Sequence, residues 1–158
     1  MLAVWRRRYE RLLEWIVIVL MATLAVEVTV GVAFRYVGYA LAWYDEVASI
    51  GLAWVTYYGA ALAALKRSHI GVPELVRMLP STARVPSALL AEACVAAFFV
   101  VLAWVGYEVL EVLASDTLVS LPAVSVAYAQ SVIPIGSLLF VVAQVFALPE
   151  VLREARQP

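Results

Sequence analysis

The sequence predicts an all-α membrane protein with four transmembrane helices and both termini in the cytoplasm. Of the 158 residues, 65% are hydrophobic and only 15% are charged, and the mean hydropathy of +0.94 lies far above that of an ordinary soluble domain. Four apolar runs are each long enough to cross a hydrocarbon layer of about 30 Å at about 1.5 Å per residue. The distribution of lysine and arginine then sets the orientation.

We expect a single transmembrane domain over residues 1–158, with helices over about 12–37, 46–65, 88–109 and 124–148. The first run is longer than the apolar region of a signal peptide and lacks a cleavage pattern, which predicts a retained signal-anchor helix. Pro134 lies inside the fourth run. Its missing N–H and the clash of its ring with the Gln130 carbonyl predict a kink there.

The cations are distributed asymmetrically about these spans. Four precede the first span, four lie in the link between the second and third spans, and two lie in the tail, so ten of the eleven fall on one side and Arg35 is the exception. Because cation-rich segments are retained in the cytoplasm, both termini are expected there.

The cytoplasmic link holds an amphipathic segment. Val72, Leu75, Val76 and Leu79 share one helical face, and Pro73 suits a first helical turn. This pattern favours a short interfacial helix lying along the membrane surface. The alternative is an irregular loop.

The second span has chemically distinct ends and a packing face. Asp45 and Glu46 occupy its first turn, where carboxylates complement the helix dipole, and Trp43 belongs to an aromatic belt before them. Either carboxylate is a suitable partner for Arg35 across the short turn. Trp54 and small residues such as Gly59 indicate helix packing rather than cofactor stacking, which would need ligands that the chain lacks.

Glu27 is an intramembrane polar residue near the middle of the first span. Ionised carboxylates are costly in lipid, so Glu27 is expected to face protein, water or a partner. One interpretation is a proton or cation carrier. The other, which we favour, is a structural carboxyl at a helix interface, hydrogen-bonded to Thr23 one turn away.

Little in the sequence indicates catalysis, cofactors or metals. His69 is the only histidine and Cys94 the only cysteine, so neither paired haem ligands nor a zinc-binding pattern occurs. Cys94 lies in an apolar run and is expected to be a buried, inert thiol. The net charge of −1 gives no basic surface for nucleic acid. We expect neither an enzyme nor a cofactor.

Several short motifs follow one another in an order typical of one transporter family. They are FRYV at 34–37, Trp43 with Asp45 and Glu46, Trp54 with Gly59 and Ala60, His69-Ile70 with Val72, WVGY at 104–107, Pro122, Tyr128 and IPIG at 133–136. In these motifs, and in its four-helix length, the chain resembles the small, DctQ-like membrane subunit of tripartite ATP-independent periplasmic (TRAP) transporters. One departure is Pro73, because the family often has an acidic residue there, whereas here Glu74 follows.

The resemblance implies a multi-pass, non-catalytic subunit in a bacterial or archaeal cytoplasmic membrane. Its partners would be a large TRAP membrane subunit, in a stable heterodimer, and transiently a periplasmic substrate-binding protein, with membrane lipid around it. The large subunit would move an organic acid with sodium. Arg35, Trp43, Asp45 and Glu46 would then lie at the periplasmic mouth and His69 at the cytoplasmic edge.

Two alternatives come from other classes of protein. One is a self-sufficient, proton-coupled small multidrug exporter of four helices that uses Glu27, although the long cytoplasmic link and strong charge bias argue against it. The other is a membrane anchor of a redox complex, which would need paired histidines.

Overall fold

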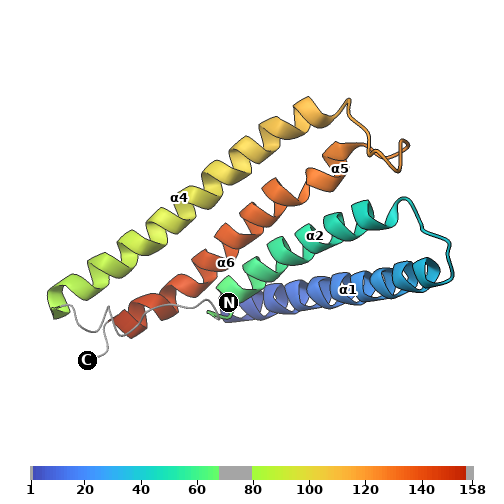
Figure 1. The fold of residues 1–158 in the computed structure, drawn as a ribbon. Coiled ribbons are helices and arrows are strands. Elements are labelled where there is room, and N and C mark those ends of the chain that lie inside the picture. Colours follow the sequence, from blue (N-terminus) through green and yellow to red (C-terminus); the bar gives the residue numbers. More distant parts are fainter. Residues whose placement is uncertain (1, 68–79, 156–158) are drawn as a thin grey trace.

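The computed structural model describes residues 2–67 and 80–155, and all of its regular elements are helical (Figure 1). They are α1 (Leu2–Tyr36), α2 (Tyr44–Leu65), α4 (Ser81–Leu113), the short α5 (Val126–Gln130) and α6 (Val132–Ala155). Four segments, 4–36, 44–65, 82–113 and 126–155, are long and apolar enough to cross a membrane. The predicted all-helical, four-span fold is thereby confirmed. The predicted interfacial helix over 72–79 lies outside the described residues.

The long helices lie side by side in the order α1, α2, α6, α4 (Figure 1). The last helix of the chain therefore lies in the interior of the row, between α2 and α4. In the most apolar window of the span that contains α6, 44% of the residues are buried, against 6% in each of the other three spans. This chain thus covers α6 well and leaves most of the other helix surfaces to lipid or to a partner.

Two of the helices extend well beyond the predicted spans. α1 already begins at Leu2, and α4 runs from Ser81 to Leu113, past Pro86, Glu108 and Glu111. Hydropathy locates the part of a helix that lies in hydrocarbon, whereas hydrogen bonding can continue into water where charged side chains are solvated or paired. Ion pairs described below involve Arg6 and Glu10 before the predicted first span and Glu150 and Glu154 after the predicted fourth span.

The fourth span is interrupted close to the predicted kink at Gln130. α5 ends at Gln130, α6 begins at Val132, and the intervening Ser131 keeps right-handed helical angles of φ −58° and ψ −21°. Pro134 has no N–H to donate to the Gln130 carbonyl, and the ladder resumes with Ile135 N donating to Ser131 O at 3.3 Å. The missing donor accounts for the interruption.

The hydrophobic core lies in the half of the molecule that contains the start of α1 and the end of α6. It consists of six buried side chains: Leu13, Ala61, Ala64, Leu65, Phe140 and Ala143. Three of the six are alanines, which let the helices approach closely. Phe99 of α4 stacks on Phe140 of α6 at a ring separation of 3.7 Å, and Tyr9 of α1 donates to Leu139 O of α6 at 2.6 Å.

Cys94 corrects one sequence expectation, because its side chain is exposed on α4 and not buried. The inference from its apolar surroundings failed because it assumed that an apolar run is covered by protein. In a membrane protein the apolar face of a helix can instead face lipid. Cys94 lies on such a face.

Candidate functional site

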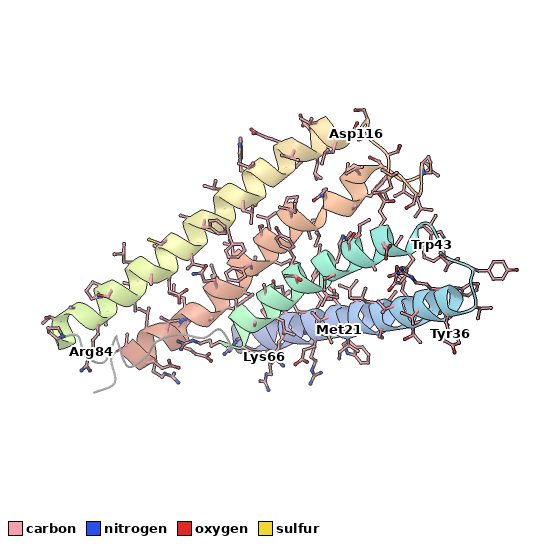
Figure 2. All side chains as sticks on the ribbon, in the orientation of Figure 1. Met21, Tyr36, Trp43, Lys66, Arg84 and Asp116 are labelled. Carbon is pink, nitrogen blue, oxygen red and sulfur yellow. The ribbon has the colours of Figure 1, made fainter. Side chains whose placement is uncertain are left out.

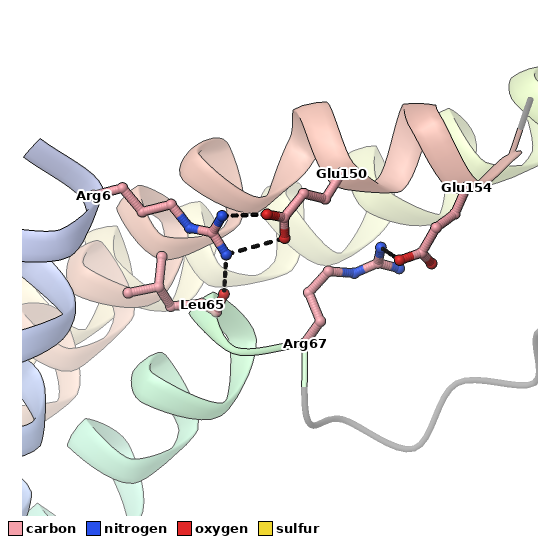
Figure 3. Close-up of polar contacts among 5 residues, drawn as sticks. All are labelled: Arg6, Leu65, Arg67, Glu150 and Glu154. Carbon is pink, nitrogen blue, oxygen red and sulfur yellow. Dashed lines mark hydrogen bonds and ion pairs between the residues drawn. The ribbon is translucent and has the colours of Figure 1, made fainter. Parts of the chain in front are cut away.

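Two ion pairs join the start of α1 and the end of α2 to α6 (Figure 3). The Arg6 guanidinium contacts both carboxylate oxygens of Glu150, with Nη2 donating to Oε2 at 3.0 Å, and Nη2 also donates to the Leu65 carbonyl at 3.3 Å. Arg67 pairs with Glu154 at 2.6 Å. Because Leu65 is the last residue of α2, Arg6 also satisfies a carbonyl at that helix end.

The chain leaves α2 through a left-handed residue. Arg67 has φ +53°, and its N–H donates to Ala64 O at 3.2 Å. This is a usual way to end a helix, although glycine is the residue that adopts it without strain. The conformation directs the arginine side chain toward Glu154 on α6 (Figure 3).

Lys66 forms a third charged contact at this end. Its Nζ pairs with Glu14, and Glu10 lies 3.9 Å away. The hydrogen bond from Lys66 to Glu14 raises the pKa of Lys66 above its ordinary value, an effect that the loss of hydration opposes and the negative charges of Glu14 and Glu10 reinforce. Figure 2 shows Lys66 and Arg84 toward this end and Tyr36, Trp43 and Asp116 at the other.

Glu46 organises the opposite end of the molecule. Its Oε1 accepts from Val119 N at 3.1 Å, and its Oε2 accepts from Ser120 N at 2.8 Å and from the Ser120 hydroxyl. The first turn of α2 therefore holds the link between α4 and α5. Within the described residues no ion pair joins Arg35 to Asp45 or Glu46, so the expected clasp does not form. The backbone donors of the link occupy Glu46 instead.

The side chain of Glu27, on α1, points toward α2 and faces Gly51. A Cβ added at Gly51 would lie 4.0 Å from Glu27 Oε2, and Glu27 Oε1 is buried without a hydrogen-bond partner. The expected hydrogen bond with Thr23 is absent from the described contacts, because the carboxyl is directed toward α2. The Glu27 carboxyl is thus at the interface of α1 and α2.

Trp54 connects α2 to the segment before the helix interruption. Its indole N–H donates to Ala129 O of α5 at 3.0 Å, and its ring lies against Tyr58. Trp54 therefore packs within this chain. Trp43 precedes α2 and makes no side-chain cap there, and His69 lies outside the described residues.

The close approaches between helices occur at glycines other than Gly59. A Cβ added at Gly59 would meet nothing within 4 Å, whereas one at Gly136 would lie 2.7 Å from Tyr57 Cβ. A Cβ added at Gly106 would similarly lie 2.9 Å from Ile133 Cγ2 and 3.2 Å from Pro134 Cδ. The sequence interpretation placed both glycines in motifs, WVGY and IPIG, but gave neither a packing role, because nothing in an apolar run marks which glycine faces a neighbouring helix.

Glu92 and Gln144 form a polar pair that the sequence interpretation also missed. Gln144 Nε2 donates to the Glu92 backbone carbonyl at 2.8 Å and to Glu92 Oε2 at 2.5 Å, which joins α6 to α4. The available signal was the presence of a glutamate and a glutamine inside two apolar runs. Among residues 2–67 and 80–155, no three His, Cys, Asp or Glu side chains gather as metal ligands would.

Four long apolar helices, joined mainly by packing and by polar contacts near their ends, define a multi-pass membrane protein. A comparison with protein families matches residues 24–156 to the tripartite ATP-independent periplasmic transporters, DctQ component. The chain therefore belongs to the DctQ family, the small membrane subunits of TRAP transporters, as its motifs suggested. A comparison with curated proteins found no match.

Proposed function

We propose that this chain is a static, non-catalytic subunit that packs on the large membrane subunit of a TRAP transporter. In this role it supports sodium-coupled uptake of an organic acid, which a periplasmic protein captures and delivers. The observation that carries the proposal is the row of helices in which only the span containing α6 is extensively buried by its own chain. The exposed apolar surface of the other helices is available to a larger membrane partner.

The helix interruption and the position of Glu27 favour a scaffolding role for this chain over direct transport of substrate. A substrate or ion site in a secondary transporter is typically built from paired broken helices and polar groups near the midplane. Among the described residues the one long span that is interrupted is the fourth, and its Pro134 packs against Gly106 of α4. Glu27 lies against Gly51 at a helix interface. These features suit a rigid frame beside a moving partner.

The test is reconstitution of uptake in liposomes with and without each component. We expect this chain to co-purify with the large subunit, and substrate uptake to require both subunits, the binding protein and a sodium gradient. Glu27→Gln should retain most of the uptake, because the proposed role gives Glu27 no proton to carry. Uptake by this chain alone, or proton-driven export abolished by Glu27→Gln, would instead favour the small-exporter alternative.

We further propose that both chain termini face the cytoplasm. The basis is the side that carries ten of the eleven cations, and four ion pairs of the described residues occur at that end. In a Cys94→Ala background, an impermeant thiol reagent added to intact cells should label Tyr39→Cys and spare Thr82→Cys. The opposite labelling pattern would reverse the orientation.

A further inference from the structure

A groove opens between α4 and α6, in the half of the molecule that holds the start of α4 and the end of α6. It has a volume of about 190 Å³ and is lined mainly by apolar side chains, with Ala93 and Ala96 among those from α4 and Val141 and Val145 among those from α6. Such a concave apolar surface in a membrane protein is filled either by lipid or by another helix. The polar groups in its wall distinguish these occupants.

The polar members of the groove are Glu92 and Gln144. Gln144 is only 8% exposed and uses its Nε2 for both contacts with Glu92. Its Oε1 remains buried without a partner, and no ion pair neutralises Glu92 among the described residues. The acceptor that the pair offers to whatever fills the groove is therefore the Glu92 carboxylate, because Gln144 Oε1 is itself inaccessible.

The depth of this pair argues against a lipid headgroup as the donor. Gln144 lies six residues before Glu150 and Glu92 lies eight residues after Arg84, which correspond to about 9 Å and about 12 Å along the respective helices. A lipid tail would match the apolar walls at that depth but would bring no hydrogen-bond donor. A transmembrane helix with one polar side chain would supply both an apolar surface for the walls and a hydrogen-bond donor for the pair.

We propose that the groove receives a transmembrane helix of the large subunit that places a lysine or arginine side chain on the Glu92 carboxylate. The proposal rests on the function proposed above and identifies the docking surface. Charge complementarity favours a basic side chain, since it would pair with the carboxylate of Glu92, which forms no ion pair among the described residues. The alanines of α4 would let the partner helix approach closely.

The first test is photo-crosslinking in the assembled two-subunit complex. A photoreactive amino acid at Ala96, in the groove, should crosslink to the large subunit in higher yield than one at Val101, which is 60% exposed on α4 and outside the groove. Lipid adducts alone at Ala96, or a yield no higher than at Val101, would overturn the assignment.

The second test is charge reversal in the same complex. Glu92→Lys should weaken association with the large subunit at least tenfold, whereas Glu108→Lys, at an α4 carboxylate bonded to Trp104, should leave it within twofold. An acidic residue at the crosslinked basic position of the partner should restore binding to Glu92→Lys. Glu92→Gln, which keeps the size of the side chain, should give a smaller loss of association. It replaces Glu92→Lys in this test if the reversed charge prevents folding.

The outcomes separate the two proposals. Failure of the unmodified chain to co-purify with the large subunit would overturn the proposed function and the docking surface together. Normal co-purification combined with full binding by Glu92→Lys would overturn the docking surface alone. Circular dichroism and size-exclusion chromatography of each variant establish that its helices are intact.

Discussion

Glu46 shows how one carboxylate can fix a link between helices. It accepts two backbone N–H groups and one hydroxyl from Val119 and Ser120, so it joins α2 to the segment after α4. Sequence reasoning identified Glu46 as an interfacial acid but offered it, or Asp45, as the partner of Arg35. Backbone donors more than seventy residues away along the chain cannot be inferred from local spacing.

We predict that Glu46→Gln lowers the unfolding midpoint of the purified protein by a few degrees. The amide keeps one acceptor oxygen, but its NH₂ group would face backbone donors. Asp45→Asn is the matched control because Asp45 is the exposed neighbouring acid, and it should change the midpoint by less than a degree. Thermal unfolding followed by tryptophan fluorescence measures both, and equal shifts would contradict the assigned role of Glu46.

Lys66 gives a prediction about pH. Its pKa is raised in the folded protein, chiefly by the hydrogen bond to Glu14, so folding strengthens proton binding and the resulting stability is complete below the ordinary pKa of 10.5. It is lost as pH rises through the higher folded-state pKa. The Lys66 side chain is 39% exposed, so the effect should be small.

The measurement compares unfolding midpoints of the native chain and of Glu14→Gln between pH 8 and pH 11.5. The difference should be constant up to about pH 10 and shrink above it. A difference that instead grows with pH would show that Glu14 does not stabilise the protonated lysine.

At the scale of helices, the contact between α2 and α6 depends on Gly136. A methyl group there would lie 2.7 Å from Tyr57 Cβ, an atom that cannot move without its backbone. Gly136→Ala should therefore separate the helices and destabilise the protein by about 1–3 kcal/mol. Gly59→Ala is the matched control, because the same methyl group there enters open space, and it should be neutral or slightly stabilising. Denaturant or thermal unfolding in detergent distinguishes the two variants.

Helix existence and the interruption near Pro134 followed from the sequence because they depend on apolar length and on a missing N–H. The contacts between helices did not follow, since apolar runs look alike on faces that meet lipid and on faces that meet protein. Cys94, expected to be buried, and Gly59, expected at a close approach, illustrate this ambiguity. The pairing of Glu92 with Gln144 needed the α4–α6 register, which no local pattern provides.

For the whole molecule, the ion pair between Arg6 and Glu150 joins the first helix to the last. Arg6→Gln and Glu150→Gln should each destabilise the protein, and the double variant should be less destabilised than the sum. The expected coupling is about 0.5–1 kcal/mol, given that both side chains are partly exposed. Arg8→Gln, at an exposed arginine of the same helix, should not couple to Glu150→Gln. Additive effects in the Arg6 cycle would contradict the contact.

The order of the helices in the row also bears on how the protein is made. α1 and α2 can pair as soon as both have entered the membrane, but the main neighbour of α4 is α6, which the ribosome delivers last. Until then, α4 lies in the bilayer without its main packing partner. The four-helix arrangement is complete only when α6 inserts between α2 and α4, which are already in the membrane. The last helix to be inserted is therefore one from the interior of the row and not one from its edge.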